Sequence, residues 1–126
     1  MRILFNMAAL FMLVACGKSL ELKQSDSGQA VMLDKGQKAV IRLPENPTTG
    51  YGWEFEVEPK KQKTITVISS KFIAGNSDLI GAGGVREYKF KAQKAGKIVI
   101  HGYYVRPWEQ LNKETASQVY YEIEVE

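Results

Sequence analysis

The stretch Asn46-Pro47-Thr48-Thr49-Gly50 lies between two segments that both have the pattern of a β-strand. Residues 38–43 precede it, and residues 51–57 follow it with large apolar side chains at every second position. This alternation is typical of a strand with one buried face. Because Pro47 disfavours a helical conformation at the residue before it and Gly50 tolerates a positive φ, the five residues predict a tight loop.

The rest of the chain repeats this pattern of short strands and turns, and it predicts a single domain. A helical period never persists beyond a turn or two, whereas residues 98–105 form an apolar run that indicates a central strand buried on both faces. Leu20 and Leu22 fit a short additional edge strand. The other expected strands are residues 29–33, 38–43, 51–57, 64–73, 85–92, 98–105 and 118–125. The pattern favours an all-β fold, an immunoglobulin-like antiparallel β-sandwich of seven or eight strands, with a small barrel as the alternative.

The order of the strands predicts where the connections meet. If consecutive strands run antiparallel, every second connection falls at the same end, which groups residues 46–50, 75–84 and 106–116. Loops at one end of a rigid sandwich are a common place for binding sites. The first loop alone is also consistent with an ordinary hairpin corner. The second and third loops contribute two further motifs, which are Gly81-Ala82-Gly83-Gly84 and Arg106-Pro107-Trp108.

Each of these two motifs has a functional and a purely structural interpretation. The glycines precede a strand instead of opening a helix, so they do not form a phosphate-binding loop, and they fit a flexible hairpin tip. Trp and Arg are enriched at binding hot spots, which favours contact with a partner for Trp108 and Arg106. The alternative is that Trp108 folds back over the end of the sandwich.

Catalysis, metal binding and nucleic-acid binding have little support in the sequence. His101 is the only histidine, and its position in mid-strand indicates a residue satisfied within the fold. A lone histidine argues against a zinc site, and no cofactor is expected. The 17 basic and 14 acidic residues are interspersed, so no nucleic-acid footprint is present. A carbohydrate or cell-wall binding module remains the rival, with rings that stack on Trp53, Trp108, Tyr51, Tyr103 and Tyr104, although the strand pattern favours a core role for Trp53 and Tyr51.

The first residues predict a targeting segment that is removed. Arg2 supplies a positive start, and residues 3–14 are apolar apart from Asn6, over a length below the roughly 20 residues that span a bilayer. Leu13-Val14-Ala15-Cys16 resembles the lipobox of bacterial lipoproteins, in which the cysteine is lipidated and becomes the new N-terminus. An ordinary secretory signal is the alternative.

This resemblance implies a membrane-anchored protein. We expect a removed segment over residues 1–15, a lipidated Cys16 with a polar tether over residues 16–28, and a folded domain over residues 29–126. In such lipoproteins an aspartate after the cysteine marks retention at the inner membrane. Because Gly17 stands there, we expect the outer membrane if the source has one.

Taken together, the three loops resemble those of the chagasin-type inhibitors of papain-like cysteine proteases, over residues 29–126. The resemblance implies an immunoglobulin-like sandwich whose loops close over the active-site cleft of a protease. It implies a central wedge made of Asn46, Pro47, Thr48, Thr49 and Gly50, one flank made of Gly81, Ala82, Gly83 and Gly84, and another made of Arg106, Pro107 and Trp108. The implied function is reversible, non-covalent, tight inhibition by a monomer in a one-to-one complex, without enzymatic activity. Residues 109–116 match no motif and are expected to tune the preference among proteases.

Overall fold

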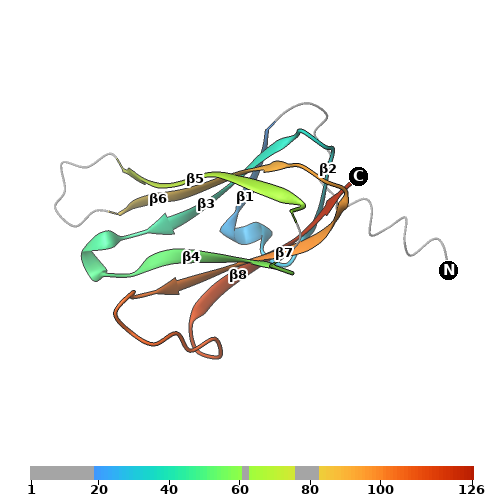
Figure 1. Cartoon of the computed structure of the whole chain (residues 1–126). Helices are drawn as coiled ribbons and strands as arrows, with labels where there is room; N and C mark the ends of the chain where they lie inside the picture. Colours follow the sequence, from blue (N-terminus) through green and yellow to red (C-terminus); the bar gives the residue numbers. More distant parts are fainter. Residues whose placement is uncertain (1–18, 61–62, 76–82) are drawn as a thin grey trace.

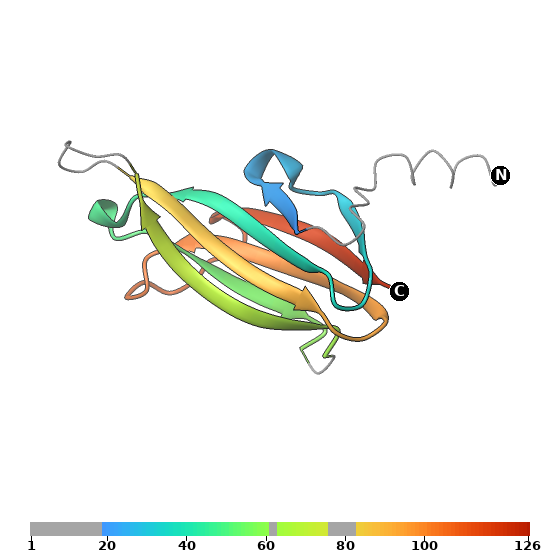
Figure 2. The same cartoon turned by 90° about the horizontal axis from the view of Figure 1, so that it is seen from above.

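The computed structural model describes residues 19–60, 63–75 and 83–126, and it shows a sandwich of two four-stranded sheets (Figures 1 and 2). The strand order in the first sheet is β1 (Leu20–Lys23), β3 (Lys38–Glu45), β6 (Gly84–Ala92) and β5 (Ile65–Ala74). In the second sheet it is β2 (Ala30–Leu33), β8 (Ser117–Val125), β7 (Gly96–Val105) and β4 (Gly52–Glu58). The predicted immunoglobulin-like β-sandwich is therefore confirmed. Across the described ranges, no helix has the length and apolar character needed to cross a membrane.

The two sheets are mixed, and in this respect they differ from the purely antiparallel expectation. β1 pairs with β3 in parallel, and β2 pairs with β8 in parallel, whereas the pairs among β3 to β8 are antiparallel. The short turn η1 (Gln24–Asp26) separates β1 from β2, and these consecutive strands belong to different sheets. Because β1 and β2 do not form a hairpin, the antiparallel rule does not apply to them.

The segment expected to be a solvated tether is partly folded. Leu20 and Leu22 are buried in the core, so the possible edge strand is confirmed as β1. The hydroxyl of Tyr121 in β8 donates to the carbonyl of Lys23 at 2.7 Å, and burial raises the pKa of Tyr121 so that it stays a neutral donor. The amide of Gly28 donates to the carbonyl of Tyr120. The tether prediction is therefore wrong for residues 20–28.

The core lies between the sheets and is built from the alternating positions of the strands. Within the first sheet the largest fully buried side chains include Ile41, Leu43 and Phe90, and in the second they include Ile100 and Tyr121. Each such side chain stabilises the fold by about 1.5–3 kcal/mol when it leaves water. The two sheets therefore depend on a shared apolar layer, which fixes the position of the loops at their ends.

Strand β7 occupies the central place that was expected, between β8 and β4, but it is not buried on both faces. Ile98 and Ile100 are buried, whereas Lys97 is exposed and His101 is half-buried on the outer face. His101 Nε2 lies 3.4 Å from Glu58 Oε1, and Nδ1 makes no hydrogen bond. The position of His101 in mid-strand is confirmed, and only one of its ring nitrogens is satisfied.

The register of the strands places the three loops at one end of the sandwich, at the left of Figure 1. Glu45 at the end of β3 pairs with Gly84 at the start of β6. Gly52 at the start of β4 pairs with Val105 at the end of β7. The prediction from alternating connections is confirmed for the described parts of the loops.

Candidate functional site: three loops at one end of the sandwich

The loop between β3 and β4 is a single turn, η2 (Pro47–Thr49), that is stabilised by its own side chains. Asn46 Oδ1 accepts hydrogen bonds from the amide of Thr48 at 3.1 Å and from its hydroxyl at 2.6 Å. Thr49 Oγ1 donates to the carbonyl of Asn46 at 2.7 Å. Gly50 closes the turn with φ of 82°, and its amide donates to the carbonyl of Pro47. We call residues 46–50 the wedge loop, and its shape exists before any partner binds.

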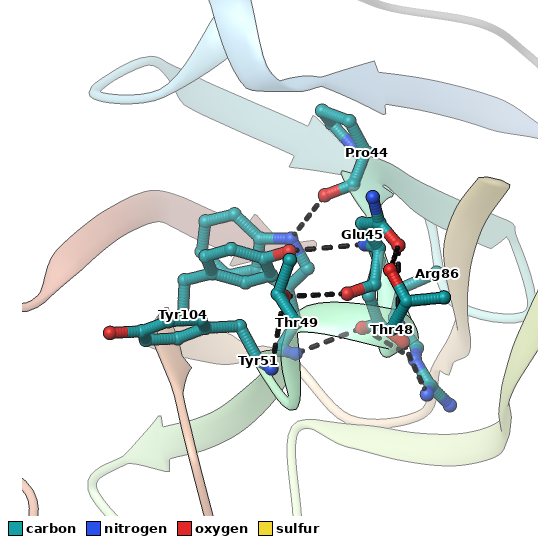
Figure 3. Close-up of polar contacts among 9 residues, drawn as sticks. Pro44, Glu45, Thr48, Thr49, Tyr51, Arg86 and Tyr104 are labelled. Atoms are coloured by element: carbon teal, nitrogen blue, oxygen red, sulfur yellow. Dashed lines mark hydrogen bonds and ion pairs between the residues drawn. The ribbon is translucent and has the colours of Figure 1, made fainter. Parts of the chain in front are cut away.

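The buried carboxylate of Glu45 holds the start of the wedge loop in place (Figure 3). Glu45 immediately precedes the wedge loop and has a side chain that is only 2% exposed. Its two oxygens accept from the guanidinium of Arg86 at 3.1 Å and 2.7 Å, and Oε1 also accepts from the amide of Trp53 at 2.9 Å. Because Arg86 lies two residues after Gly84, this ion pair joins the bases of the first and second loops.

Aromatic side chains connect the wedge loop to the second sheet. The hydroxyl of Tyr104 in β7 accepts from the amide of Asn46 at 3.1 Å. The ring of Tyr104 stacks on Tyr51, with 5.3 Å between centroids, and lies 4.9 Å from Trp53. Trp53 belongs to the core as expected, whereas Tyr51 is half-buried and lies beneath the third loop. Tyr51 therefore supports the site rather than the core.

The third loop lies directly against the wedge loop. Trp108 is 70% exposed, so the interpretation in which it folds back over the sandwich is wrong. The edge of its indole rests on Gly50, where a Cβ atom would lie only 2.3 Å from Cη2 of the ring. A side chain at position 50 would displace the indole. Gly50 thus permits both the left-handed turn and the position of Trp108.

Arg106 joins the first and third loops. Its Nε donates to the carbonyl of Thr49 at 3.2 Å, and its Nη1 lies 3.4 Å from Glu109. The guanidinium carbon lies 4.4 Å from the centre of the Tyr51 ring and 5.9 Å from that of Trp108, in the range of cation–π contacts. The side chain therefore holds the two loops together, in addition to any contact with a partner.

The second loop borders the wedge loop on its other side. Gly83 packs so closely that a Cβ atom there would lie 3.0 Å from the carbonyl oxygen of Glu45 and 3.5 Å from Cβ of Asn46. Gly84 has no room for a side chain either, since its Cβ would lie 2.1 Å from the carbonyl oxygen of Ile73. Gly81 and Ala82, the other two predicted residues of this flank, lie outside the described residues.

Residues 109–116 fold back along the outer face of the second sheet. Lys113 forms an ion pair with Glu56 at 3.2 Å and lies over the ring of Tyr103. Gln118 Nε2 donates to the carbonyl of Lys113 at 2.8 Å. The segment is fixed to the sheet by these contacts, so Trp108 stands at the tip of the third loop.

Sequence reasoning predicted the loop residues of the candidate site and missed the buried ion pair that holds the loops. Glu45 and Arg86 were not singled out, and Tyr104 was named only as an aromatic residue of the rival carbohydrate-binding module. One signal was available for Glu45, which falls on the inward side of the alternation that includes Ile41 and Leu43. A charged residue at such a position requires a buried partner.

The fold and the site define a class of protein, a β-sandwich with three loops at one end, in which the first loop contacts each of the other two. Residues 32–123 match the family described as Chagasin family peptidase inhibitor I42. This match extends over most of the chain, and the chain therefore belongs to the chagasin family of peptidase inhibitors.

Individual relatives agree with this assignment. The chain is 30% identical to chagasin from Trypanosoma cruzi over 92 residues, which cover 71% of this chain and 84% of chagasin. It resembles the crystal structure of the cysteine protease inhibitor EhICP2 from Entamoeba histolytica, with a TM-score of 0.75 and 22% identity over 86% of this chain and 96% of that one. The structure of PbICP-C in complex with falcipain-2 gives a TM-score of 0.60 and 19% identity over 91% of this chain and 97% of that one. The two structural matches show a common fold.

Proposed function

We propose that this protein is a reversible, non-covalent inhibitor of papain-like cysteine proteases that inserts the wedge loop into the active-site cleft. The main support for this proposal is the contact between the first and third loops, in which Trp108 rests on Gly50 and Arg106 donates to the carbonyl of Thr49. A braced loop loses little conformational entropy on binding, which favours a tight complex. The membership of the chain in an inhibitor family and the complex of PbICP-C with falcipain-2 support the choice of protease class.

The wedge loop suits inhibition better than cleavage. A papain-like site attacks a peptide carbonyl with a thiolate beside a protonated histidine. In the wedge loop the carbonyls of Asn46, Pro47 and Thr49 already accept internal hydrogen bonds. The loop is a compact turn, so it differs from the extended peptide that such a cleft accepts. We therefore expect the loop to fill the cleft and to remain intact.

The direct test is a titration of papain, at known active-site concentration, with the fragment 17–126. This fragment retains the eight strands that the structure describes, since β1 begins at Leu20 and β8 ends at Val125. We expect a stoichiometric loss of activity on a peptide substrate and recovery of uncleaved inhibitor from the complex. Full activity in a large excess of folded fragment, repeated with two other papain-like enzymes, would refute the proposed function.

Replacement of Trp108 by alanine should weaken inhibition of papain about 30-fold, which corresponds to about 2 kcal/mol for a hot-spot residue. The side chain is 70% exposed, so the unfolding temperature should not change. The matched control is Leu111→Ala, which removes another exposed apolar side chain from the same loop. If both variants change the inhibition constant equally, Trp108 has no special role.

Replacement of Arg106 by lysine keeps the charge but removes the planar group that spans the two loops. We expect inhibition to weaken about fivefold, since the lysine cannot both donate to Thr49 and stack on Tyr51. Arg42→Lys is the control, because Arg42 lies in mid-strand on the first sheet and not at the site. An inhibition constant for Arg106→Lys equal to that of the parent would contradict the bracing role.

The rival carbohydrate-binding function has less support. Trp53 and Tyr103 are buried, and Tyr51 and Tyr104 stack on each other, so of the five candidate aromatic residues only Trp108 is largely exposed. In the described part of the chain, no group of His, Cys, Asp or Glu side chains could hold a metal ion. The site thus favours a protein partner.

We also propose that the protein is a monomer and that it binds its protease one to one without enzymatic activity of its own. A lipidated Cys16 would anchor it to a membrane of the cell envelope, the outer membrane if the source has one. The lipobox-like stretch of residues 13–16 supports the anchor, and this segment lies outside the described residues. Membrane fractionation of the full chain and of its Cys16→Ser variant tests the anchor. The parent should fractionate with membranes, and a parent protein found only in the soluble fraction would refute this part of the proposal.

A further inference from the structure

Lysines gather at the end of the sandwich opposite the three loops, which we call the basic end. The turns there contact one another, since the amide of Gly36 donates to the carbonyl of Ala92 and the amides of Gln93 and Lys94 donate to the carbonyl of Thr64. The C-terminal Glu126 lies at this end as well, at the right of Figure 1. Seven exposed lysines occupy these turns and the adjoining strand ends, namely Lys35, Lys38, Lys60, Lys63, Lys91, Lys94 and Lys97.

Carboxylates compensate the positive charge of these lysines only in part, for example where Glu124 stands opposite Lys97. Lys38 and Lys91 stand directly opposite each other on β3 and β6, an arrangement of like charges that destabilises a sheet. Within the described residues, none of the seven takes part in an ion pair, whereas Arg42, Arg86 and Arg106 all do. Five side-chain carboxylates lie at the same end, on Asp34, Glu58, Glu122, Glu124 and Glu126, and the seven lysines outnumber them, so the basic end keeps an excess of positive charge.

The direction of β1 relates this end to the proposed lipid anchor. β1 runs parallel to β3, with Leu20 opposite Ala39, so the chain enters the sandwich from the basic end. The four steps from Cys16 to Leu20 span at most about 14 Å of extended chain. Because Leu20 is buried in the core, this length cannot increase without loss of β1 contacts. A lipid on Cys16 would therefore hold the basic end close to the bilayer.

We propose that the basic end binds the surface of an anionic phospholipid bilayer and that the three loops point away from the membrane. The location of the protein at a membrane rests on the proposed anchor, whereas the affinity for anionic lipid rests on the lysines alone. Each lysine near an anionic surface strengthens binding about fivefold, and this effect operates within a Debye length of about 10 Å. The short link to Cys16 keeps the lysines within that range, so their role is to orient the domain.

Vesicle flotation of the fragment 17–126, which lacks Cys16, tests this proposal without the lipid. The vesicles contain phosphatidylcholine alone or with about one-third phosphatidylglycerol, the anionic lipid. We expect binding to the anionic vesicles at low ionic strength, release at about 0.5 M salt, and no binding to the neutral vesicles. Failure to bind the anionic vesicles at low ionic strength would overturn the proposal.

Two triple variants with equal net charge locate the binding surface. Lys38→Gln/Lys91→Gln/Lys94→Gln should weaken binding about 100-fold, whereas the control variant should lose less than about fivefold. The control changes lysines that lie away from the basic end, and is Lys23→Gln/Lys71→Gln/Lys113→Gln. Equal losses in the two variants would show that the basic end is not the binding surface.

A single variant separates binding from folding. Lys38→Glu places a carboxylate opposite Lys91, so it should raise the unfolding temperature and still weaken vesicle binding.

Orientation is tested by titrating papain with the fragment bound to anionic vesicles, which should inhibit with the same stoichiometry as the free fragment. Loss of inhibition only on vesicles would reverse the proposed orientation, and loss of inhibition without vesicles would instead refute the inhibitor function.

Discussion

Replacement of Glu45 by alanine should lower the free energy of unfolding by about 3 kcal/mol, because it leaves the guanidinium of Arg86 without its buried partner. The side chain of Glu45 is 2% exposed and that of Arg86 is 23% exposed, so little water is available to replace the lost carboxylate. The amide of Trp53 loses its acceptor as well. For a domain of this size the change corresponds to a fall of about 15 °C in the unfolding temperature, which thermal unfolding measures directly.

Glu21→Ala is the matched control for this prediction. The Glu21–Arg42 pair has the same separation as the Glu45–Arg86 pair, 2.7 Å, but both side chains are more than 40% exposed. An exposed pair contributes about 1 kcal/mol or less. If Glu21→Ala and Glu45→Ala destabilise the protein equally, burial of Glu45 is not what makes its ion pair important. The bases of the first two loops would then be held by other contacts.

Replacement of Gly50 by alanine should weaken protease inhibition about 100-fold. The new Cβ would lie 2.3 Å, 3.1 Å and 3.3 Å from three carbon atoms of the Trp108 ring, so the indole must move. Displacement of a hot-spot residue costs about 2 kcal/mol. A residue with a side chain disfavours the positive φ of 82° by about 1 kcal/mol, and relief of this cost through a change in the turn would alter the wedge loop and weaken inhibition further. A papain titration against the parent fragment measures the combined effect.

Gly36→Ala separates the two causes. Gly36 has a φ of 89°, and nothing lies within 4 Å of the position its Cβ would take. This variant carries the same backbone cost at the opposite end of the sandwich, so it should lose about 1 kcal/mol of stability and keep full inhibition. A Gly50→Ala variant that inhibits as well as Gly36→Ala would show that the contact between Gly50 and Trp108 does not matter for binding.

Both predictions concern the support of the loops rather than the residues that reach a protease. Glu45 and Arg86 hold the base of the wedge loop, and Gly50 leaves room for the indole of Trp108. When loops are fixed in the free protein, binding does not have to restrict them. A loss of support should therefore appear as weaker inhibition even where the exposed side chains are unchanged.

Sequence periodicity by itself determined the strands and the end at which the loops meet. Each predicted strand lies within two residues of the observed one, because alternation of apolar residues reports directly which side chains face the core. The position of the loops followed from chain order, since antiparallel neighbours return to the same end. The tight turn of the wedge loop could also be predicted, because Pro47 and Gly50 determine the local backbone conformation.

Tertiary structure alone decided which strands are partners and how the loops are braced. Period-two alternation does not distinguish parallel from antiparallel neighbours, so the pairing of β1 with β3 and of β2 with β8 was missed. The Glu45–Arg86 pair and the contact between Gly50 and Trp108 join residues far apart in the chain. Such contacts exist only after the sheets pack, because the partners carry no local signal of each other. The sequence therefore determined which loops meet and predicted the residues of the candidate site, and packing decided what holds those loops in place.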